Sequence, residues 1–414
     1  MGLTSGLFAT LMFAAAGLGL VAVVVCWPLA RRQTVGHIAA RVGMILVSQV
    51  LVIAAFLVYL NSYFGFYGSW SELFGSGNTQ IVGVAKASNP NAPLLTITGA
   101  APAPAPGAPV RSVKSRPPVA TGGRPKGVLG TLDDADLAET GELLSVNING
   151  QHTGIAVEDD FVYLPPQYFQ PAYAHARFPV VLALTGYPGS SWSIVKRLKL
   201  PGSQETLVQA GKITPAVDVM MNASVAMPRD TECTNIPSGP QVETFFGVDV
   251  PDAMERMFRV QSGPSGWAAI GYSTGGFCAV KLAMMYPHQF STAVSLAGYY
   301  QALEDNTTGN LYGSSPGYRA ENSPDWRLQH LPAPPVSVLV ASSVQGERTY
   351  PGTVQFAHLV RPPMRVYTLY LRQGGHNFRT WGLELIQALK WLSQRLTPAV
   401  GKAPAGAVRH RKLA

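Results

Sequence analysis

The sequence predicts an α/β domain built on a mostly parallel sheet, preceded by membrane-spanning segments. From about Gly141 onward, short apolar runs of the kind that form buried parallel strands alternate with helical stretches. One such run, beginning at Trp267, leads into Gly271-x-Ser273-x-Gly275, and a helical segment follows at once. This order of strand, sharp turn and helix is typical of a turn that presents a nucleophilic serine. The N-terminal part adds two long uncharged runs.

The composition separates a membrane part from a folded part. Charged residues make up only 13% of the 414 residues and hydrophobic residues 47%, which is too apolar for a soluble enzyme. The net charge of +8 is concentrated outside the predicted domain, in the segment 84–130 and in the tail from Val400. Residues 131–399 are left with a net negative charge. We therefore expect no nucleic-acid partner for the folded domain.

The first 83 residues are predicted to form a two-helix membrane anchor. The runs at about 5–27 and 42–67 are long enough to cross a bilayer as helices. A cleaved signal peptide is the alternative, but the first positive charges, Arg31 and Arg32, follow the first run instead of preceding it. These arginines and Arg41 lie between the two runs, which places that loop in the cytoplasm and the rest of the chain outside. We expect a multi-pass protein of the cell membrane with an extracytoplasmic domain.

Residues 84–140 are rich in Pro, Ala and Gly and include Ala101-Pro-Ala-Pro-Ala-Pro-Gly-Ala-Pro109. Such a segment cannot bury a core, so we expect a disordered spacer that holds the domain off the membrane. The domain itself is expected over 141–398, and a basic tail over 399–414.

Within the domain, the apolar runs predict three opening strands and then a series of buried ones. The predicted strands are 143–148, 154–157, 161–164, 178–184, 216–221, 267–270, 292–296, 336–340 and 366–370. The main predicted helices are 203–210, 250–260, 277–285 and 381–396. Strands that alternate with helices imply right-handed crossovers in one sheet.

A nucleophilic serine needs a base and an acid that orients the base. In this type of sheet all three should follow the carboxyl ends of strands. Ser273 is the nucleophile candidate, and His376, directly after the last strand, is the base candidate because Gly374 and Gly375 let its loop turn back over the sheet.

The acid is expected after the penultimate strand, in chain order between the serine and the histidine. Glu347 is the only carboxylate there, and Glu304 and Asp305, after the preceding strand, are the alternatives. A glutamate beside Arg348 is equally compatible with a solvated surface pair.

Two backbone N–H groups are expected to stabilise the oxyanion. One is that of Thr274, the residue after the nucleophile. The other should come from the turn Thr185-Gly186-Tyr187-Pro188, where Tyr187 is preferred because proline has no N–H.

The three cysteines offer one possible disulfide. Cys26 lies in an apolar run, so Cys233 and Cys278 could pair outside the cytoplasm, with two buried free thiols as the alternative. The sequence contains no CxxC or Cys/His cluster, and we expect neither a metal site nor a cofactor.

The arrangement resembles the esterase-like α/β-hydrolases of actinobacteria, a family related to the antigen 85 mycolyltransferases and esterase D. The resemblance covers about Ser145 to Leu396. It rests on the segment Gln241 to Pro251, the turn Gly271 to Gly275, Ser295-Leu-Ala-Gly298, Leu311-Tyr-Gly-Ser-Ser315 and Gly375-His376-Asn377 through Trp381. It implies an α/β-hydrolase fold and a triad of Ser273, Glu347 and His376.

We therefore expect a membrane-anchored serine esterase or acyltransferase that works through an acyl-enzyme. Its substrate would be an ester, with an acyl-lipid or mycolyl-type ester allowed by the resemblance, and a cell-envelope polymer is a further expected partner. The alternative is a catalytically silent surface module that retains the α/β-hydrolase fold for binding.

Overall fold

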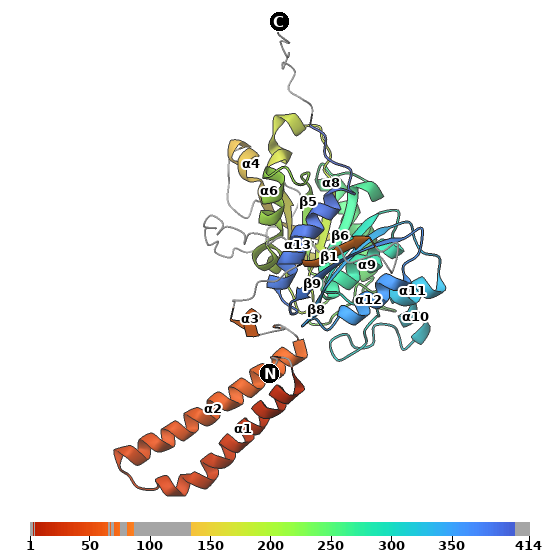
Figure 1. Cartoon of the computed structure of the whole chain (residues 1–414). Helices are drawn as coiled ribbons and strands as arrows, with labels where there is room; N and C mark the ends of the chain where they lie inside the picture. Colours follow the sequence, from red (N-terminus) through yellow and green to blue (C-terminus); the bar gives the residue numbers. More distant parts are fainter. Residues whose placement is uncertain are drawn as a thin grey trace.

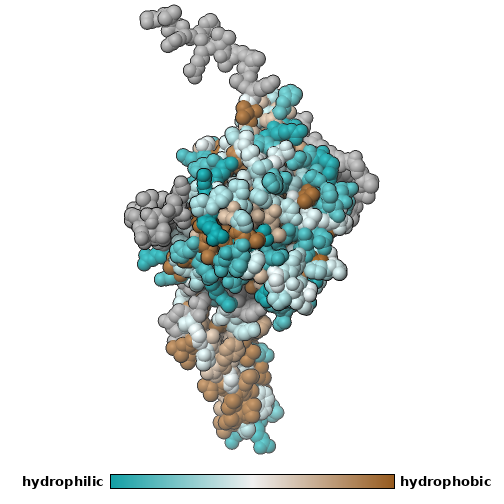
Figure 2. Space-filling model, turned by 90° about the vertical axis from the view of Figure 1, so that its right-hand side faces the viewer, coloured by the Kyte–Doolittle hydropathy of each residue, from teal (hydrophilic) through white to brown (hydrophobic). Residues whose placement is uncertain are grey.

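The computed structural model describes residues 3, 5–64, 67, 70–74, 81–86 and 134–401. Most of the predicted linker and the predicted tail from residue 402 therefore lie outside the described residues. Figure 1 shows a helical hairpin beside one folded domain. Figure 2 shows the same hairpin as a mostly apolar column against a largely hydrophilic domain surface.

The hairpin consists of α1 (Gly6–Cys26) and α2 (Val35–Phe64), joined through the short helix η1 (Trp27–Ala30). The stretches 6–30 and 35–62 are long and apolar enough to cross a membrane, and only 6% and 11% of their most apolar windows are buried. A core helix of a soluble protein would be mostly buried. The second helix begins at Val35, earlier than the predicted start at 42, and thus includes Arg41.

A short helix and an edge strand follow the hairpin. Helix α3 (Trp70–Leu73) lies against the start of α1, since the rings of Trp70 and Phe8 are 5.1 Å apart. Strand β1 (Ile81–Lys86) belongs to the sheet of the domain, and helix α4 (Asp134–Thr140) precedes the next strand. The expected linker over 84–140 thus overlaps described elements at both ends.

The domain is organised around a nine-stranded sheet in the order β1-β9-β8-β7-β6-β4-β5-β3-β2. Strands β4 to β9 run parallel, and β1, β2 and β3 pair antiparallel with their neighbours. Their bounds are β2 (Glu142–Asn149), β3 (Ala156–Leu164), β4 (Val180–Leu184), β5 (Val217–Met221), β6 (Trp267–Tyr272), β7 (Thr292–Leu296), β8 (Ser337–Gln345) and β9 (Arg365–Gln373). The predicted mostly parallel α/β sheet is confirmed. The two short strands predicted at 154–157 and 161–164 are wrong, because they form the single strand β3.

Helices cover both faces of the sheet, and alternate strand residues point to opposite layers. In β4, Val180, Leu182 and Leu184 join one core with α8 (Val250–Met257), α9 (Thr274–Met285), α11 (Pro324–His330) and α12 (Tyr350–Leu359). Val181 and Ala183 face the other core, with α6 (Leu200–Gln209) and α13 (Phe378–Ser393). The remaining helices are short: η2 (Pro166–Phe169), η3 (Pro171–Tyr173), α5 (Ser191–Ser193), η4 (Ile194–Leu198), α7 (Val242–Thr244), η5 (Phe245–Asp249), η6 (Pro264–Gly266) and α10 (Pro316–Glu321).

Candidate active site

Ser273 lies in the tight turn between β6 and α9. Its backbone has φ 55° and ψ −123°, a conformation that side-chain-bearing residues rarely adopt. Its N–H donates a hydrogen bond to the carbonyl of Leu296, 3.0 Å away, at the end of the neighbouring strand β7. The flanking glycines are required by space, because a Cβ on Gly271 would lie 2.2 Å from the backbone of Gly275, and a Cβ on Gly275 would lie 2.2 Å from the carbonyl oxygen of Leu184. The turn therefore holds a partly exposed hydroxyl above the sheet edge.

Glu347 and His376 lie side by side after the ends of β8 and β9. Glu347 Oε2 is 3.0 Å from His376 Nδ1, and the glutamate side chain is almost completely buried while the histidine ring remains partly exposed. The other carboxylate oxygen accepts a hydrogen bond from the Thr349 N–H at 3.2 Å. With Nδ1–H donating to the carboxylate, Nε2 is the nitrogen left to accept a proton.

The alternative acids are engaged elsewhere. Glu304 lies 3.6 Å from the guanidinium of Arg319. Asp305 caps its own turn, and hydrogen bonds from Thr307 and Thr308 lower its pKa even though partial burial acts in the opposite direction. Of the three candidates, Glu347 is the one beside His376.

Aromatic rings connect the histidine loop to the serine turn. The ring of Trp381, in the first turns of α13, stacks on Tyr272 at 4.5 Å and meets the His376 ring edge to face at 5.0 Å. Tyr272 directly precedes Ser273 at the end of β6. The aromatic contacts therefore connect the loop after β9 to β6, although β8 and β7 lie between these two strands in the sheet. No hydrogen bond joins the hydroxyl of Ser273 to His376 among the described residues. Such contacts are often long in ligand-free enzymes and shorten when substrate binds.

The turn after β4 lies directly against the serine. A Cβ on Gly186 would lie 2.9 Å from the Cβ of Ser273. The next residue, Tyr187, donates a hydrogen bond from its phenol to the carbonyl of Pro228 at 2.5 Å. Its backbone N–H and that of Thr274 thus belong to the two segments that border Ser273, where an oxyanion would form.

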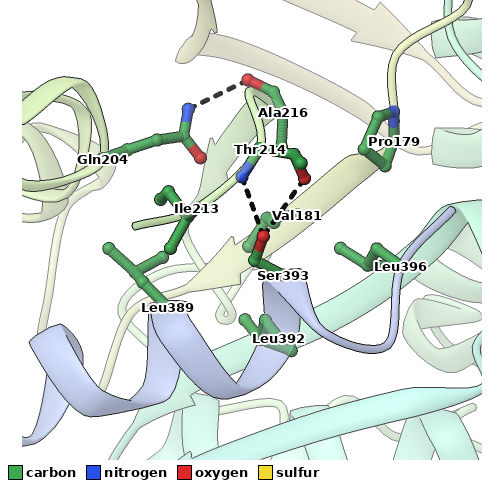
Figure 3. Close-up of a pocket in the computed structure, with 10 residues that line it drawn as sticks. All are labelled: Pro179, Val181, Gln204, Ile213, Thr214, Ala216, Leu389, Leu392, Ser393 and Leu396. Carbon is green, nitrogen blue, oxygen red and sulfur yellow. Dashed lines mark hydrogen bonds between the residues drawn. The ribbon is translucent and has the colours of Figure 1, made fainter. Parts of the chain in front are cut away.

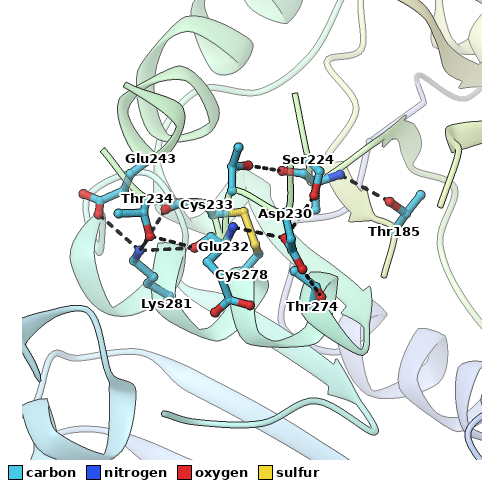
Figure 4. Close-up of a disulfide and its surroundings, with 12 residues drawn as sticks. Thr185, Ser224, Asp230, Glu232, Cys233, Thr234, Glu243, Thr274, Cys278 and Lys281 are labelled. Carbon is cyan, nitrogen blue, oxygen red and sulfur yellow. Dashed lines mark hydrogen bonds and ion pairs between the residues drawn. A yellow bond between two sulfur atoms is a disulfide. The ribbon is translucent and has the colours of Figure 1, made fainter. Parts of the chain in front are cut away.

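A buried polar cluster that the sequence reasoning missed supports Thr274 (Figure 4). The Thr274 hydroxyl donates to Asp230 Oδ2 at 3.2 Å and lies 3.2 Å from the phenol oxygen of Tyr299, whose hydroxyl donates to Glu232. Burial raises the pKa of Asp230 and holds that of Glu232 well above its usual range. These residues come from a loop far from the serine in sequence, and no local pattern marks them.

The same loop is fixed to α9 by the disulfide between Cys233 and Cys278, whose Cα atoms are 5.6 Å apart. Lys281, one turn further along α9, donates to the carbonyl of Cys233 at 2.8 Å and to the Thr234 hydroxyl. Burial lowers the pKa of Lys281 to about 8, partly offset by nearby Glu243. Cys26, the last residue of α1, is a free cysteine.

A second buried acid, Glu384 on α13, lies near the pair of Glu347 and His376. Burial holds its pKa well above its usual range, and the charge of Glu347 acts in the same direction. Among the described residues, no three His, Cys, Asp or Glu side chains gather in a way that could hold a metal ion.

A small pocket is present elsewhere in the domain (Figure 3). It lies at the amino end of β4, between Pro179 and the end of α13, and its lining includes the hydrogen bonds from Thr214 to Ser393 and from Gln204 to Ala216. Ser273 follows the carboxyl end of β6, whereas the pocket lies at the amino end of the parallel strand β4. This pocket is therefore separate from the candidate site.

The strand order, the serine turn and the paired histidine and glutamate define the class of protein as a serine hydrolase of the α/β-hydrolase fold. The family model described as "Putative esterase" matches residues 160–392, more than half of the chain. The chain belongs to this esterase family and is a serine ester hydrolase.

Two solved structures share this fold, with TM-scores of 0.53 and 0.51. A ferulic acid esterase is 18% identical, with a TM-score of 0.53 over 62% of this chain and 99% of that one. An S-formylglutathione hydrolase from Agrobacterium tumefaciens is 14% identical, with a TM-score of 0.51 over 62% and 96% of the two chains. MPT51 of Mycobacterium tuberculosis is 16% identical over 62% of this chain and 99% of that one, with a TM-score of 0.43. No curated protein sequence matches the chain.

Proposed function

We propose that the protein is a membrane-anchored, extracytoplasmic esterase or acyltransferase in which Ser273, His376 and Glu347 form the catalytic triad. The observation that carries this proposal is the Glu347–His376 hydrogen bond, joined through Trp381 and Tyr272 to the strained turn of Ser273. The two apolar helices are consistent with anchoring in a membrane, and Arg31 and Arg32 between them favour a cytoplasmic loop.

The reaction would proceed through an acyl-enzyme. The hydroxyl oxygen of Ser273 attacks the ester carbonyl while His376 Nε2 takes its proton, and Glu347 stabilises the imidazolium that forms. The N–H groups of Thr274 and Tyr187 stabilise the negative oxygen of the tetrahedral intermediate. The intermediate then expels the alcohol, which receives the proton from His376. Water or an acceptor hydroxyl next attacks the acyl-serine, releasing an acid or a transferred ester.

A covalent label tests the nucleophile. The full chain in detergent should react with a fluorophosphonate probe, and Ser273→Ala should abolish both labelling and turnover of a short acyl ester. Ser203→Ala, a substitution on the surface helix α6, is the matched control and should label like the wild type. If Ser273→Ala still labels, Ser273 is not the nucleophile. If the wild type neither labels nor turns over ester, the alternative of a silent binding module takes its place.

A further inference from the structure

The chain enters the domain beside the carboxyl ends of the parallel strands, where Ser273 and His376 lie. We call this end of the strands the catalytic edge. Strand β1 pairs antiparallel with β9, with Ile81 opposite Leu371 and Lys86 opposite Tyr367. The first residue of β1 is thus beside the carboxyl end of β9, which continues directly to His376. If β1 ran parallel to β9, the chain would instead enter the domain beside the amino ends of the strands.

The connection from the anchor to this edge is short. Helix α3 ends at Leu73, and Phe74 follows it. Seven residue steps separate Phe74 from Ile81, which is a reach of at most about 25 Å. Figure 1 shows α3 between the anchor helices and the domain. Trp70 and Phe74 stack on one another and are exposed, as aromatic residues at a membrane surface commonly are.

The Pro/Ala-rich segment does not lengthen this connection. Residues 87–133 connect β1, the outermost strand on one side of the sheet, to α4 and β2, which is the outermost strand on the other side. The segment therefore comes after the point where the chain first joins the sheet. The expected role of this segment as a spacer between membrane and domain does not fit this order of elements.

The catalytic edge also carries most of the exposed apolar side chains of the domain. Six large hydrophobic residues are exposed within residues 134–401: Trp192, Met227, Met257, Leu303, Val344 and Val400. Four of them follow or end strands at the carboxyl edge: Trp192 after β4, Met227 after β5, Leu303 after β7 and Val344 in the last residues of β8. We call these four residues the apolar rim. Exposed apolar side chains at the carboxyl ends of the strands are suited to contact with lipid or with an acyl chain.

We infer that the catalytic edge faces the membrane and that the substrate is an acyl ester carried in the bilayer. This inference rests on the proposed function of Ser273, and it adds where the ester comes from. The short connection keeps Ser273 near the surface in which such an ester lies, and the apolar rim receives the acyl chain as the ester group reaches the serine. The acyl group moves to Ser273, the alcohol part of the lipid leaves with the proton from His376, and water or a hydroxyl completes the turnover.

The test measures two rates on the full chain reconstituted in phosphatidylcholine vesicles. One substrate is a short, water-soluble acyl ester, and the other is a long-chain fluorogenic glycerolipid ester in the same vesicles. The first variant carries a thirty-residue helical spacer between Ser76 and Gly77, which adds about 45 Å to the connection. The matched control carries the same spacer between Gly107 and Ala108, within the segment 87–133.

The quantity compared is the ratio of the lipid-ester rate to the soluble-ester rate, which a partial loss of folded enzyme leaves unchanged. We expect this ratio to fall at least tenfold with the spacer at Ser76 and to stay within twofold with the spacer at Gly107. An unchanged ratio in the first variant, or an equal fall in both, overturns the inference. Met227→Gln should also lower the ratio, whereas Met257→Gln, at the end of α8 away from the apolar rim, should not. Loss of the proposed function appears separately, as soluble-ester turnover that survives Ser273→Ala.

Discussion

Gly186 sets how closely the turn after β4 approaches Ser273, the proposed nucleophile. A Cβ at this position would lie 2.9 Å from the Cβ of Ser273 and 3.1 Å from the carbonyl oxygen of Tyr272, and both belong to a turn with little freedom to move. Gly186→Ala should therefore displace Ser273 relative to its oxyanion donors.

We expect Gly186→Ala to lower kcat about 100-fold, the size of loss that a displacement of about 1 Å produces in an active site. Steady-state kinetics on a short acyl ester measure the effect. Gly202→Ala on α6 is the control, since no atom lies within 4 Å of its added Cβ, and it should leave kcat unchanged. Equal rates for Gly186→Ala and the wild type would show that the turn after β4 does not position the serine.

At the scale of single residues, the sequence predicted the serine and the histidine more firmly than the acid. Chain order and the flanking glycines mark Ser273 and His376, because both depend on local turns. The acid was open between Glu347 and the pair Glu304 and Asp305, since chain order does not say which loop folds back to the imidazole. In the structure Glu347 contacts His376, whereas Glu304 and Asp305 have other partners. The catalytic role of Glu347 is our proposal.

Helix α9, which follows the turn of Ser273, is held in place by a disulfide in addition to its own hydrogen bonds. The disulfide ties Cys278, on its second turn, to Cys233 in the loop that also carries Asp230 and Glu232. This loop therefore links Thr274, the proposed oxyanion donor, to the middle of α9. The element that presents Ser273 and the element that supports its neighbour are covalently joined.

Removing the bond should loosen this unit. We expect the double variant Cys233→Ala/Cys278→Ala to lose about 2–4 kcal/mol of stability, since the bond closes a loop with a sequence separation of 45 residues. Thermal unfolding in detergent with and without a thiol reductant provides the measurement. Reductant should lower the Tm of the wild type and of Cys26→Ala but not that of the double variant. A wild-type Tm that does not respond to complete reduction would contradict a stabilising role.

Among the elements, the edge strand β1 could not be predicted. Its six residues form an isolated apolar run beside the Pro/Ala-rich segment, and its partner β9 is almost 300 residues away in the chain. By contrast, β4 to β9 were close to prediction because continuous apolar runs are typical of strands buried on both faces. Long-range pairing of a short edge strand leaves no comparable local pattern.

For the molecule as a whole, several buried acids make stability depend on pH. Asp160, in β3, is almost fully buried, and burial raises its pKa from 3.8 to about 7. In the unfolded chain its carboxyl has the ordinary value. The folded state therefore holds one more proton between about pH 4 and 7, so the stability from the neutral carboxyl is complete below pH 4 and is lost as pH rises through 7.

We expect Asp160→Asn to remove this dependence, which amounts to at most about 1.4 kcal/mol per pH unit within that interval. The Tm of the variant relative to the wild type should rise between pH 5 and pH 7 in detergent solution. Glu158→Gln, an exposed neighbour on the same strand, should show no such trend. A relative Tm that is constant with pH would show that Asp160 is ionised in the folded protein throughout the interval.

The position of β1 has a consequence for proteolytic shedding of the enzyme. A cut anywhere in 87–133 separates the anchor with β1 from the rest of the domain, so the released fragment would keep eight of the nine strands. Its β9 would then present an open row of backbone donors and acceptors, which pairs readily with other chains. In the uncut chain β1 pairs with β9 and prevents this self-association, whereas a shed form would be prone to aggregate through the strand that leads to His376.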